Sequence, residues 1–282
     1  MRGPRPRGER GPLASFVLHT TLVAASLVSV FPVVWLVLTS LKPRDGWLSS
    51  EPRVFDSPSL DNYGRVLTET AFPSWLLNSV LVAGLTTVAG VFLAATTGYA
   101  ISRFRFPGHR WVMWTLLVTQ MFPVAVLIVP LYDLMAALRL LNRLPGLVVA
   151  YMTVAVPFCA WMMKGYFDAI PREIDQAGMV DGLGPFGAFA RIVLPLARPG
   201  LAVTAFYCFM TAWGEIAYAS VFMNEEERRT LGAGLQRFVG QHWSDWGLLT
   251  AAAVLIAVPA AAVFLLVQRH LVKGLTAGAT TM

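Results

Sequence analysis

Apolar residues dominate six long stretches of this chain, and polar residues gather in the segments between them. A helix rises about 1.5 Å per residue, so about 20 apolar residues cross the roughly 30 Å hydrocarbon core of a membrane. The stretches match or approach that length. They predict an all-α polytopic membrane protein with six transmembrane helices, over residues 13–41, 75–101, 111–138, 147–163, 201–223 and 247–267.

The composition agrees with this prediction and excludes a soluble domain. Hydrophobic residues make up 56% of the chain and charged residues 13%, with a mean hydropathy of +0.60, whereas about a quarter of the residues in a soluble domain are charged. The net charge of +6 would suit a nucleic-acid partner. The basic residues, however, lie mainly between the apolar stretches, where Lys and Arg set the orientation of a membrane protein.

Six spans place both termini on the same side of the membrane. The segments on that side hold most of the 22 basic residues, so both termini are predicted to be cytoplasmic. Residues 1–12, rich in Arg, Pro and Gly, are predicted to form a disordered basic tail. Residues 13–282 are predicted to form a single transmembrane domain.

Prolines interrupt several of the predicted spans, and two explanations remain open. A proline frees a backbone carbonyl, which in lipid must be satisfied by neighbouring helices or by a water-filled cavity. The prolines therefore indicate either kinked packing or a permeation pathway, and they are Pro32, Pro123, Pro130, Pro157 and Pro259.

No pattern in the chain predicts an enzyme or a metal site. Residues 182–187 read GxGxxG, but no strand precedes them and Pro185 removes an amide donor. Asp133 lacks the second acid of an intramembrane protease, and the histidines have no nucleophile motif. The chain also lacks a phosphate-binding loop for hydrolysing ATP itself. Cys159 and Cys208 are predicted to be buried free thiols.

One acid lies inside the fifth apolar stretch. Glu215 follows Trp213 and Gly214, and a charge inside a membrane is costly and usually functional. We expect Glu215 to face a polar cavity or a helix partner, and we take Trp213 and Glu215 as candidates for a substrate pathway.

The segment between the fourth and fifth stretches, residues 164–198, is the most informative. It predicts two short helices around a glycine turn, with Pro171 in the first turn of one and Pro185 starting the other. The first helix places Ile174, Ala177, Gly178 and Asp181 on one face, where small residues would let another surface approach. An amphipathic hairpin packed on its own bundle is the alternative.

This segment resembles the EAA motif of permease subunits in bacterial ABC importers, EAA-x3-G-x9-I-x-LP. Its spacing is reproduced by Gln176-Ala177-Gly178, Gly182, Ile192 and Leu194-Pro195. Residues 40–43, 62–63, 78–79, 103–108, 268–269 and 274–278 also resemble the carbohydrate branch of that family. The best match is the smaller six-span permease of maltose- and trehalose-type importers, and the likeness covers nearly the whole chain.

The resemblance implies that residues 164–198 carry a coupling helix that docks in a cleft of a cytoplasmic ATPase. ATP and Mg²⁺ would bind to two copies of that ATPase, and no cofactor to this chain. The remaining partners would be a second permease and an extracytoplasmic sugar-binding protein, approached by residues 224–246, in a bacterial or archaeal cell membrane. The coupling residues implied are Asp175, Gln176, Ala177, Gly178, Asp181, Gly182, Ile192, Leu194 and Pro195.

The chain departs from the family pattern at three places. Gln176 replaces the glutamate of the motif, and the neighbouring Asp175 is a candidate to supply the lost charge, although it points about 100° away on a helix. Gly178 replaces the second alanine. Trp213-Gly214 stands where the family usually has Trp-Asn.

Two other functions remain open at this stage. A permease for glycerol phosphate or another polyol would favour a basic cavity, but Arg and Lys are scarce inside the spans. An ion-coupled secondary carrier would normally show more ionisable residues in its spans and an internal repeat. The sequence favours import of a disaccharide or oligosaccharide, such as maltose or trehalose, without identifying which sugar.

Overall fold

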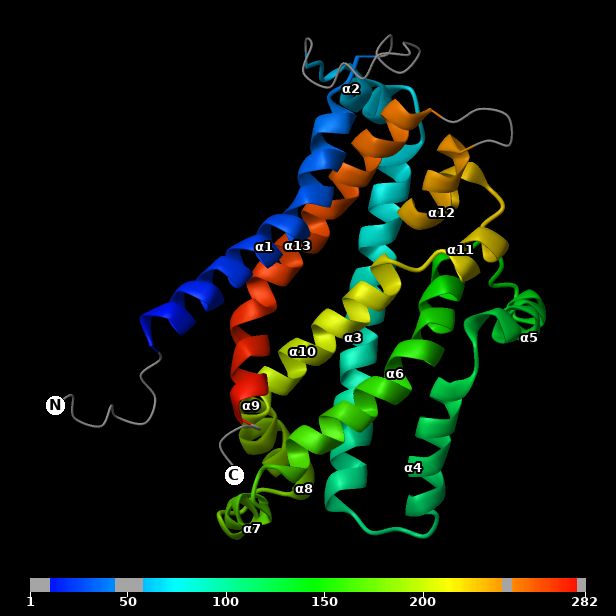
Figure 1. Ribbon diagram of the computed structural model, residues 1–282. Coiled ribbons are helices and arrows are strands. Elements are labelled where there is room, and N and C mark those ends of the chain that lie inside the picture. The colour runs from blue at the N-terminus through cyan, green and yellow to red at the C-terminus, as the bar shows by residue number, and fades with distance from the viewer. Residues whose placement is uncertain (1–10, 44–57, 240–244, 278–282) are drawn as a thin grey trace, which may run out of the picture.

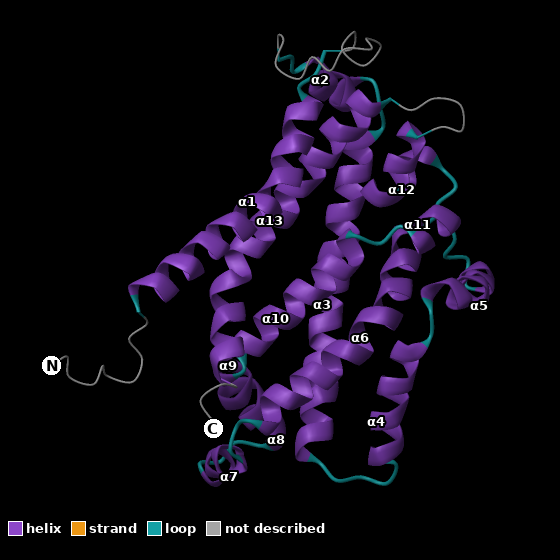
Figure 2. Ribbon diagram, in the orientation of Figure 1, coloured by secondary structure: helices purple, strands orange, loops and turns teal. Residues whose placement is uncertain are grey.

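The computed structural model describes residues 11–43, 58–239 and 245–277, and the side chains as far as 269. The described part contains helices and no strand (Figure 2). The predicted tail over residues 1–12 lies almost entirely outside the described residues. The helices are α1 (Pro12–Ser40), α2 (Asp61–Thr68), α3 (Phe72–Arg103), α4 (His109–Val118), α5 (Val124–Ala137), α6 (Leu144–Asp168), α7 (Arg172–Val180), α8 (Pro185–Ala188), α9 (Leu194–Leu196), α10 (Arg198–Trp213), α11 (Ala217–Phe222), α12 (Leu231–Leu235) and α13 (Trp246–Ala277).

Four of the predicted spans are single helices of the expected length. They are α1, α3, α6 and α13, each long and apolar enough to cross a membrane. Three of these helices continue through an interior proline, at Pro32, Pro157 and Pro259. Of these four, α3 alone has no proline beyond its first turn, so it has no proline kink.

The third predicted span, 111–138, is not one helix, which corrects the sequence-based prediction. Residues His109–Met121 and Val124–Ala137 meet at an angle of 107°. Pro123 lies at the break with an extended backbone, as does Phe122 before it. A proline cannot donate the next helical hydrogen bond, and it disfavours helical geometry at the preceding residue.

The fifth predicted span, 201–223, is also broken. The helix α10 ends at Trp213, residues 214–216 are not helical, and α11 then runs over Ala217–Phe222. At its other end, α10 meets the segment Pro185–Leu196 at an angle of 81°. Counting each bent pair as one span gives six spans by length and composition.

The centre of the bundle is formed by α3, α6 and α10, which pack closely through small residues (Figure 1). A Cβ atom on Gly98 would lie 2.9 Å from the backbone nitrogen of Lys164 in α6. A Cβ atom on Gly90 would lie 2.9 Å from the Sγ atom of Cys208 in α10. Cys159 and Cys208 are both buried free thiols, as predicted, with their sulfur atoms 3.4 Å apart.

Candidate coupling site at one end of the bundle

The segment after α6 folds as two short helical elements around a glycine turn, as the sequence predicts. The first element is α7 (Figure 1). Gly182 then takes a φ of +90°, a conformation that residues with a side chain rarely adopt. The second element begins with α8 at Pro185 and continues as a π-helical turn, Phe189–Val193, into α9.

The two helical elements, which carry the two halves of the motif, pack against each other at Gly178. A Cβ atom at this position would overlap the Cδ1 atom of Ile192, so a residue with a side chain would have to displace Ile192. The carbonyl of Gly178 also accepts a hydrogen bond from the backbone N–H of Leu183, at 3.0 Å. Gly178 therefore holds the hairpin together.

This packing corrects the expected shared face of α7. Gly178 is buried against Ile192, whereas Ala177 and Asp181 are exposed, as is Gln176. Ala177 and Gly178 are adjacent residues about 100° apart around the helix, which allows one to face the hairpin and the other to stay open. The surface available to a partner therefore includes Gln176, Ala177 and Asp181 but excludes Gly178.

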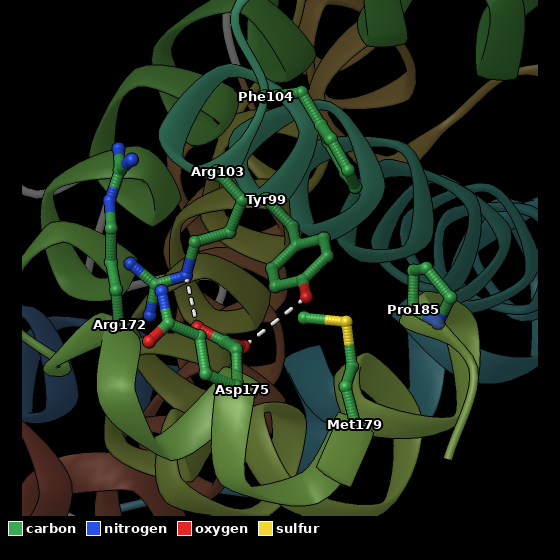
Figure 3. A pocket seen from close by; sticks show the side chains of 8 residues that line it. Tyr99, Arg103, Phe104, Arg172, Asp175, Met179 and Pro185 are labelled. Carbon is green, nitrogen blue, oxygen red and sulfur yellow. Dashed lines mark hydrogen bonds and ion pairs between the residues drawn. The ribbon is translucent and has the colours of Figure 1, made fainter. Parts of the chain in front are cut away.

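Asp175 is engaged inside the chain. Its side chain is 6% exposed, and its Oδ2 atom lies 2.7 Å from the Nε atom of Arg103 at the end of α3. The hydroxyl of Tyr99, one turn earlier in α3, donates a hydrogen bond to Oδ1 at 3.2 Å (Figure 3). The expectation that Asp175 supplies the charge lost at Gln176 does not fit this geometry, because its carboxylate is already paired with Arg103.

Further polar contacts fasten this end of α3 to the loop around α7. The Nη2 atom of Arg103 donates to the carbonyl of Ile170 at 2.9 Å, and that of Arg172 donates to the carbonyl of Ser102 at 2.7 Å. Ser102 in turn donates to Asp168 at 2.6 Å. A side chain of α3 thus binds the backbone of the loop, and a side chain of the loop binds the backbone of α3.

The segment from α7 to α9, Arg172–Leu196, is called the coupling hairpin below. A pocket of about 160 Å³ lies between α3 and this hairpin, lined by Tyr99, Arg103, Phe104, Arg172, Asp175, Gln176, Met179 and Pro185 (Figure 3). Next to it, Val180 is 87% exposed and Phe186 is 76% exposed. This end of the bundle thus exposes apolar side chains beside a pocket whose walls combine charged and apolar residues.

The remaining motif residues anchor the hairpin. Ile192, Leu194 and Pro195 are half-buried. Phe189, in the π-helical turn, lies with its ring centroid 4.5 Å from that of Tyr99 and 6.2 Å from that of Phe167. Aromatic packing therefore joins the second half of the motif to α3 and α6.

Trp213 and Glu215 lie elsewhere, at the break of the fifth span. The carboxylate of Glu215 accepts hydrogen bonds from the backbone N–H groups of Tyr218 and Ala219, at 2.8 and 3.2 Å. It therefore stabilises the first turn of α11, where free N–H groups favour an anion. Trp213 is buried and stacked on Phe209, with ring centroids 5.2 Å apart. Their role in a substrate pathway stays a prediction.

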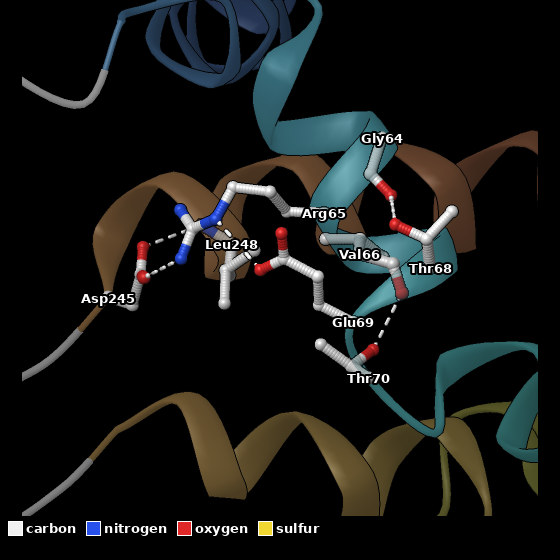
Figure 4. A network of polar contacts seen from close by, with 8 residues as sticks. All are labelled: Gly64, Arg65, Val66, Thr68, Glu69, Thr70, Asp245 and Leu248. Atoms are coloured by element: carbon white, nitrogen blue, oxygen red, sulfur yellow. Dashed lines mark hydrogen bonds and ion pairs between the residues drawn. The ribbon is translucent and has the colours of Figure 1, made fainter.

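At the opposite end of the bundle, α2 is joined to the start of α13. Arg65 in α2 forms ion pairs with Asp245 at 3.0 Å and Glu69 at 3.3 Å (Figure 4). Burial lowers the pKa of Arg65, but its interactions with the two carboxylates outweigh burial and raise the pKa above its usual value. This network lies near the ends of α1 and α13, far from α7 (Figure 1).

Tyr99 and Arg103 are functional candidates that the sequence does not single out. In the sequence Arg103 is only one of the basic residues that orient the chain and one of residues 103–108, which resemble the carbohydrate branch, and Tyr99 lies inside an apolar stretch. Their spacing of four residues puts them on one face of a helix, which is the available signal. Nothing in that spacing identifies Asp175 as their common partner.

Residues 86–277 match the family model described as "Binding-protein-dependent transport system inner membrane component". The chain belongs to this family. The match includes most of α3 and every later described helix, with the coupling hairpin inside it.

Several relatives in the family are similar over almost their whole length. The "Trehalose/maltose transport system permease protein MalG" of Thermococcus litoralis is 32% identical, covering 95% of this chain and 97% of the relative. The "Maltose/maltodextrin transport system permease protein MalG" of Vibrio parahaemolyticus is 35% identical, covering 92% and 93%. The "Sulfoquinovosyl glycerol transport system permease protein SmoH" of Agrobacterium fabrum is 33% identical, covering 91% of each.

The fold is also known from solved structures. A chain in the "Crystal structure of a bacterial ABC transporter involved in the import of the acidic polysaccharide alginate" superposes with a TM-score of 0.79 at 22% identity, covering 94% of this chain and 99% of that one. A chain of the inward-facing MetNI methionine ABC transporter gives a TM-score of 0.58 at 18% identity, covering 69% and 92%. The chain is therefore a multi-pass membrane protein with the fold of an ABC importer permease.

Proposed function

We propose that this chain is the membrane-spanning permease subunit of an ATP-driven sugar importer and forms half of its translocation pathway. The observation that carries the proposal is the coupling hairpin. This chain belongs to the family and has the motif spacing of an importer permease. It presents α7 and the Gly182 turn at one end of the bundle. Its outer surface, with Gln176, Ala177 and Val180, is open to a partner.

The partner of that surface is a cytoplasmic ATPase. ATP and Mg²⁺ bind to the ATPase subunits, and this chain supplies no catalytic group. When two ATPase subunits close on ATP, they move α7, and the bundle follows because α7 is joined to α3 by the pair of Asp175 and Arg103. Both termini lie on the same cytoplasmic side as α7.

The complete transporter contains further subunits. A second permease pairs with this one in the inner membrane of a bacterium or archaeon, two copies of the ATPase bind below them, and an extracytoplasmic binding protein delivers the sugar. The long exposed apolar surface of α1 and the bent pair α4–α5 suit lipid and the second permease. Residues 224–246, of which 240–244 lie outside the described residues, are proposed to meet the binding protein.

The proposed substrate is a disaccharide or oligosaccharide such as maltose or trehalose. The names of the relatives support this class, since they refer to trehalose, maltose, maltodextrin and sulfoquinovosyl glycerol. Each of these compounds contains a sugar unit. The second permease and the binding protein share the choice of sugar with this chain.

The test is to purify the tagged chain from gently solubilised membranes and to identify the proteins that accompany it by mass spectrometry. We expect an ATPase, a second permease and a binding protein. The binding protein is then titrated with maltose, trehalose and glycerol 3-phosphate by calorimetry. A homo-oligomer without an ATPase would contradict the proposal and favour a secondary carrier. Binding of glycerol 3-phosphate alone would contradict the sugar assignment.

A further inference from the structure

The helix α3 is fastened to functional elements at both of its ends. At one end it holds α7 through Tyr99 and Arg103. At the other end its side chains bind backbone carbonyls of the loop that follows α11. The Nε1 atom of Trp75 donates to the carbonyl of Glu226 at 2.7 Å, and the amide of Asn78 donates to those of Glu227 and Arg229 at 2.7 and 3.0 Å.

The same end of α3 also supports α12. The hydroxyl of Ser79 accepts a hydrogen bond from the backbone N–H of Leu231, at 2.8 Å. A Cβ atom on Gly234 would overlap the ring of Trp75, so α12 rests directly on this tryptophan. The loop and α12 therefore follow any displacement of the first turns of α3.

The span between these two attachments is built to move as one body. No proline interrupts it, and about 36 Å of helix axis separates Ser79 from Arg103 at 1.5 Å per residue. Gly98 allows α3 to lie in direct backbone contact with α6. An unbroken helix in close packing passes on a displacement instead of absorbing it.

The helix that directly follows the hairpin in sequence is a poorer route. A bend of 81° separates α10 from the segment containing α8 and α9. At its far end α10 stops at Trp213, and a non-helical segment precedes α11. A displacement of the hairpin meets a joint at each end of α10 but none along α3.

We infer that α3 is a rigid element that transmits movement of the coupling helix α7 to residues 224–239 on the opposite face of the membrane. Arg103, paired with Asp175, is the positioning residue at one end, and Asn78 is its counterpart at the other. The inference rests on the proposed function. It extends that function by giving a physical route along which ATP binding inside alters the surface that meets the binding protein outside.

The experiment measures the accessibility of a cysteine placed on the loop as a reporter, and it removes contacts at either end of α3. Val239, which is half exposed, is replaced by Cys in the complex purified through a tag on this chain. The rate of labelling by a water-soluble maleimide is measured with and without the ATP analogue AMP-PNP and Mg²⁺. The native cysteines are buried and are expected to react slowly.

We expect the nucleotide to change the labelling rate of the reporter. Asp175→Asn should reduce that change at least about fivefold, the lower end of typical coupling between sites. Asp175→Glu, which keeps the carboxylate, should retain most of it. Asn78→Ala should reduce the change from the other end. The double variant should be no worse than the stronger single variant, because both interrupt the same route.

Two matched variants control for unspecific effects. Glu173→Gln removes an exposed carboxylate from α7, and Thr96→Ala removes the hydroxyl of a half-buried residue of α3 that bonds back to its own helix. In both variants the nucleotide should change the labelling rate as much as it does in the parent, the Val239→Cys protein without a further substitution. Co-purification of the ATPase with each variant verifies folding and assembly.

Several outcomes would overturn the inference. They are an unchanged response in Asp175→Asn, independent effects of the two single variants that multiply in the double variant, and an ATPase-bound parent whose reporter ignores the nucleotide. Absence of the ATPase from the parent complex is a different result, which contradicts the proposed function itself.

Discussion

The two ends of α3 are fastened by different chemistry. At the α7 end, a buried carboxylate and a guanidinium form an ion pair, so the contact depends on the side chains of both Asp175 and Arg103. At the α12 end, Trp75 and Asn78 bind backbone carbonyls of the loop. The loop can therefore change its side chains without losing these bonds, whereas a change at Asp175 removes the ion pair and leaves Arg103 only its bond to the backbone carbonyl of Ile170. Arg103→Met and Gly234→Ala test this difference directly, and Gly178→Val and Arg65→Met test contacts beside the two ends; they follow from the largest expected effect to the smallest.

Gly178→Val should have the largest effect on transport, because its side chain would overlap Ile192 and push the two halves of the motif apart. Overpacking of this kind costs about 1–3 kcal/mol, and we expect ATP-dependent uptake of the sugar to fall at least about tenfold. Gly184→Ala is the control, since its Cβ atom meets no neighbour within 4 Å. Adding Ile192→Ala should restore part of the uptake, and normal uptake by Gly178→Val alone would refute this packing.

Arg103→Met should be the most destabilising change at the α7 end. It leaves the carboxylate of Asp175 buried without its cation, which typically costs about 3 kcal/mol, and the thermal unfolding midpoint in detergent should fall. Arg105→Met, at an exposed position, should leave the midpoint unchanged. Because the cost arises from the orphaned charge, Arg103→Met with Asp175→Leu should recover stability. A double variant less stable than Arg103→Met would contradict this explanation.

Gly234→Ala tests the opposite end with a single methyl group. The new Cβ atom would overlap the ring of Trp75, and shifting α12 to accommodate it should cost about 1–2 kcal/mol. The matched control is Gly64→Ala, where a Cβ atom has open space. The measurement is the thermal unfolding midpoint of each variant, which should be lower for Gly234→Ala than for Gly64→Ala. Equal midpoints would show that α12 does not rest on Trp75.

Arg65→Met should have the smallest effect, about 0.5–1 kcal/mol, because its ion pairs lie near the surface. Since the pKa of Arg65 is raised above its usual value, its contribution is fully present below that usual value and is lost only as the pH rises through the raised pKa. The difference in unfolding midpoint between Arg65→Met and the parent should therefore be the same at pH 7 and pH 9. A difference that shrinks at pH 9 would contradict the conclusion that Arg65 is still protonated at that pH.

The sequence predicts what depends on local pattern and misses what depends on packing. Apolar length identifies α1, α3, α6 and α13, and the motif spacing identifies the hairpin with its Gly182 turn. The breaks in the third and fifth spans are not predicted, even with Pro123 in view, because other prolines such as Pro157 lie within continuous helices.

The pairing of Asp175 with Arg103 cannot be predicted for a different reason. The two residues lie far apart in the sequence and meet because α3 packs against α6, whose end carries the hairpin. From helical spacing alone, Gly178 is predicted to lie on an open face of α7. The spacing does not show that Ile192, in the second half of the motif, packs against this glycine.

The first helix has a consequence for how this protein can be handled. It lies along α13 with apolar side chains exposed over most of its length. Only lipid, detergent or another apolar membrane-spanning chain can keep such a surface away from water. A preparation stripped of all three should therefore associate through α1 before its interior unfolds.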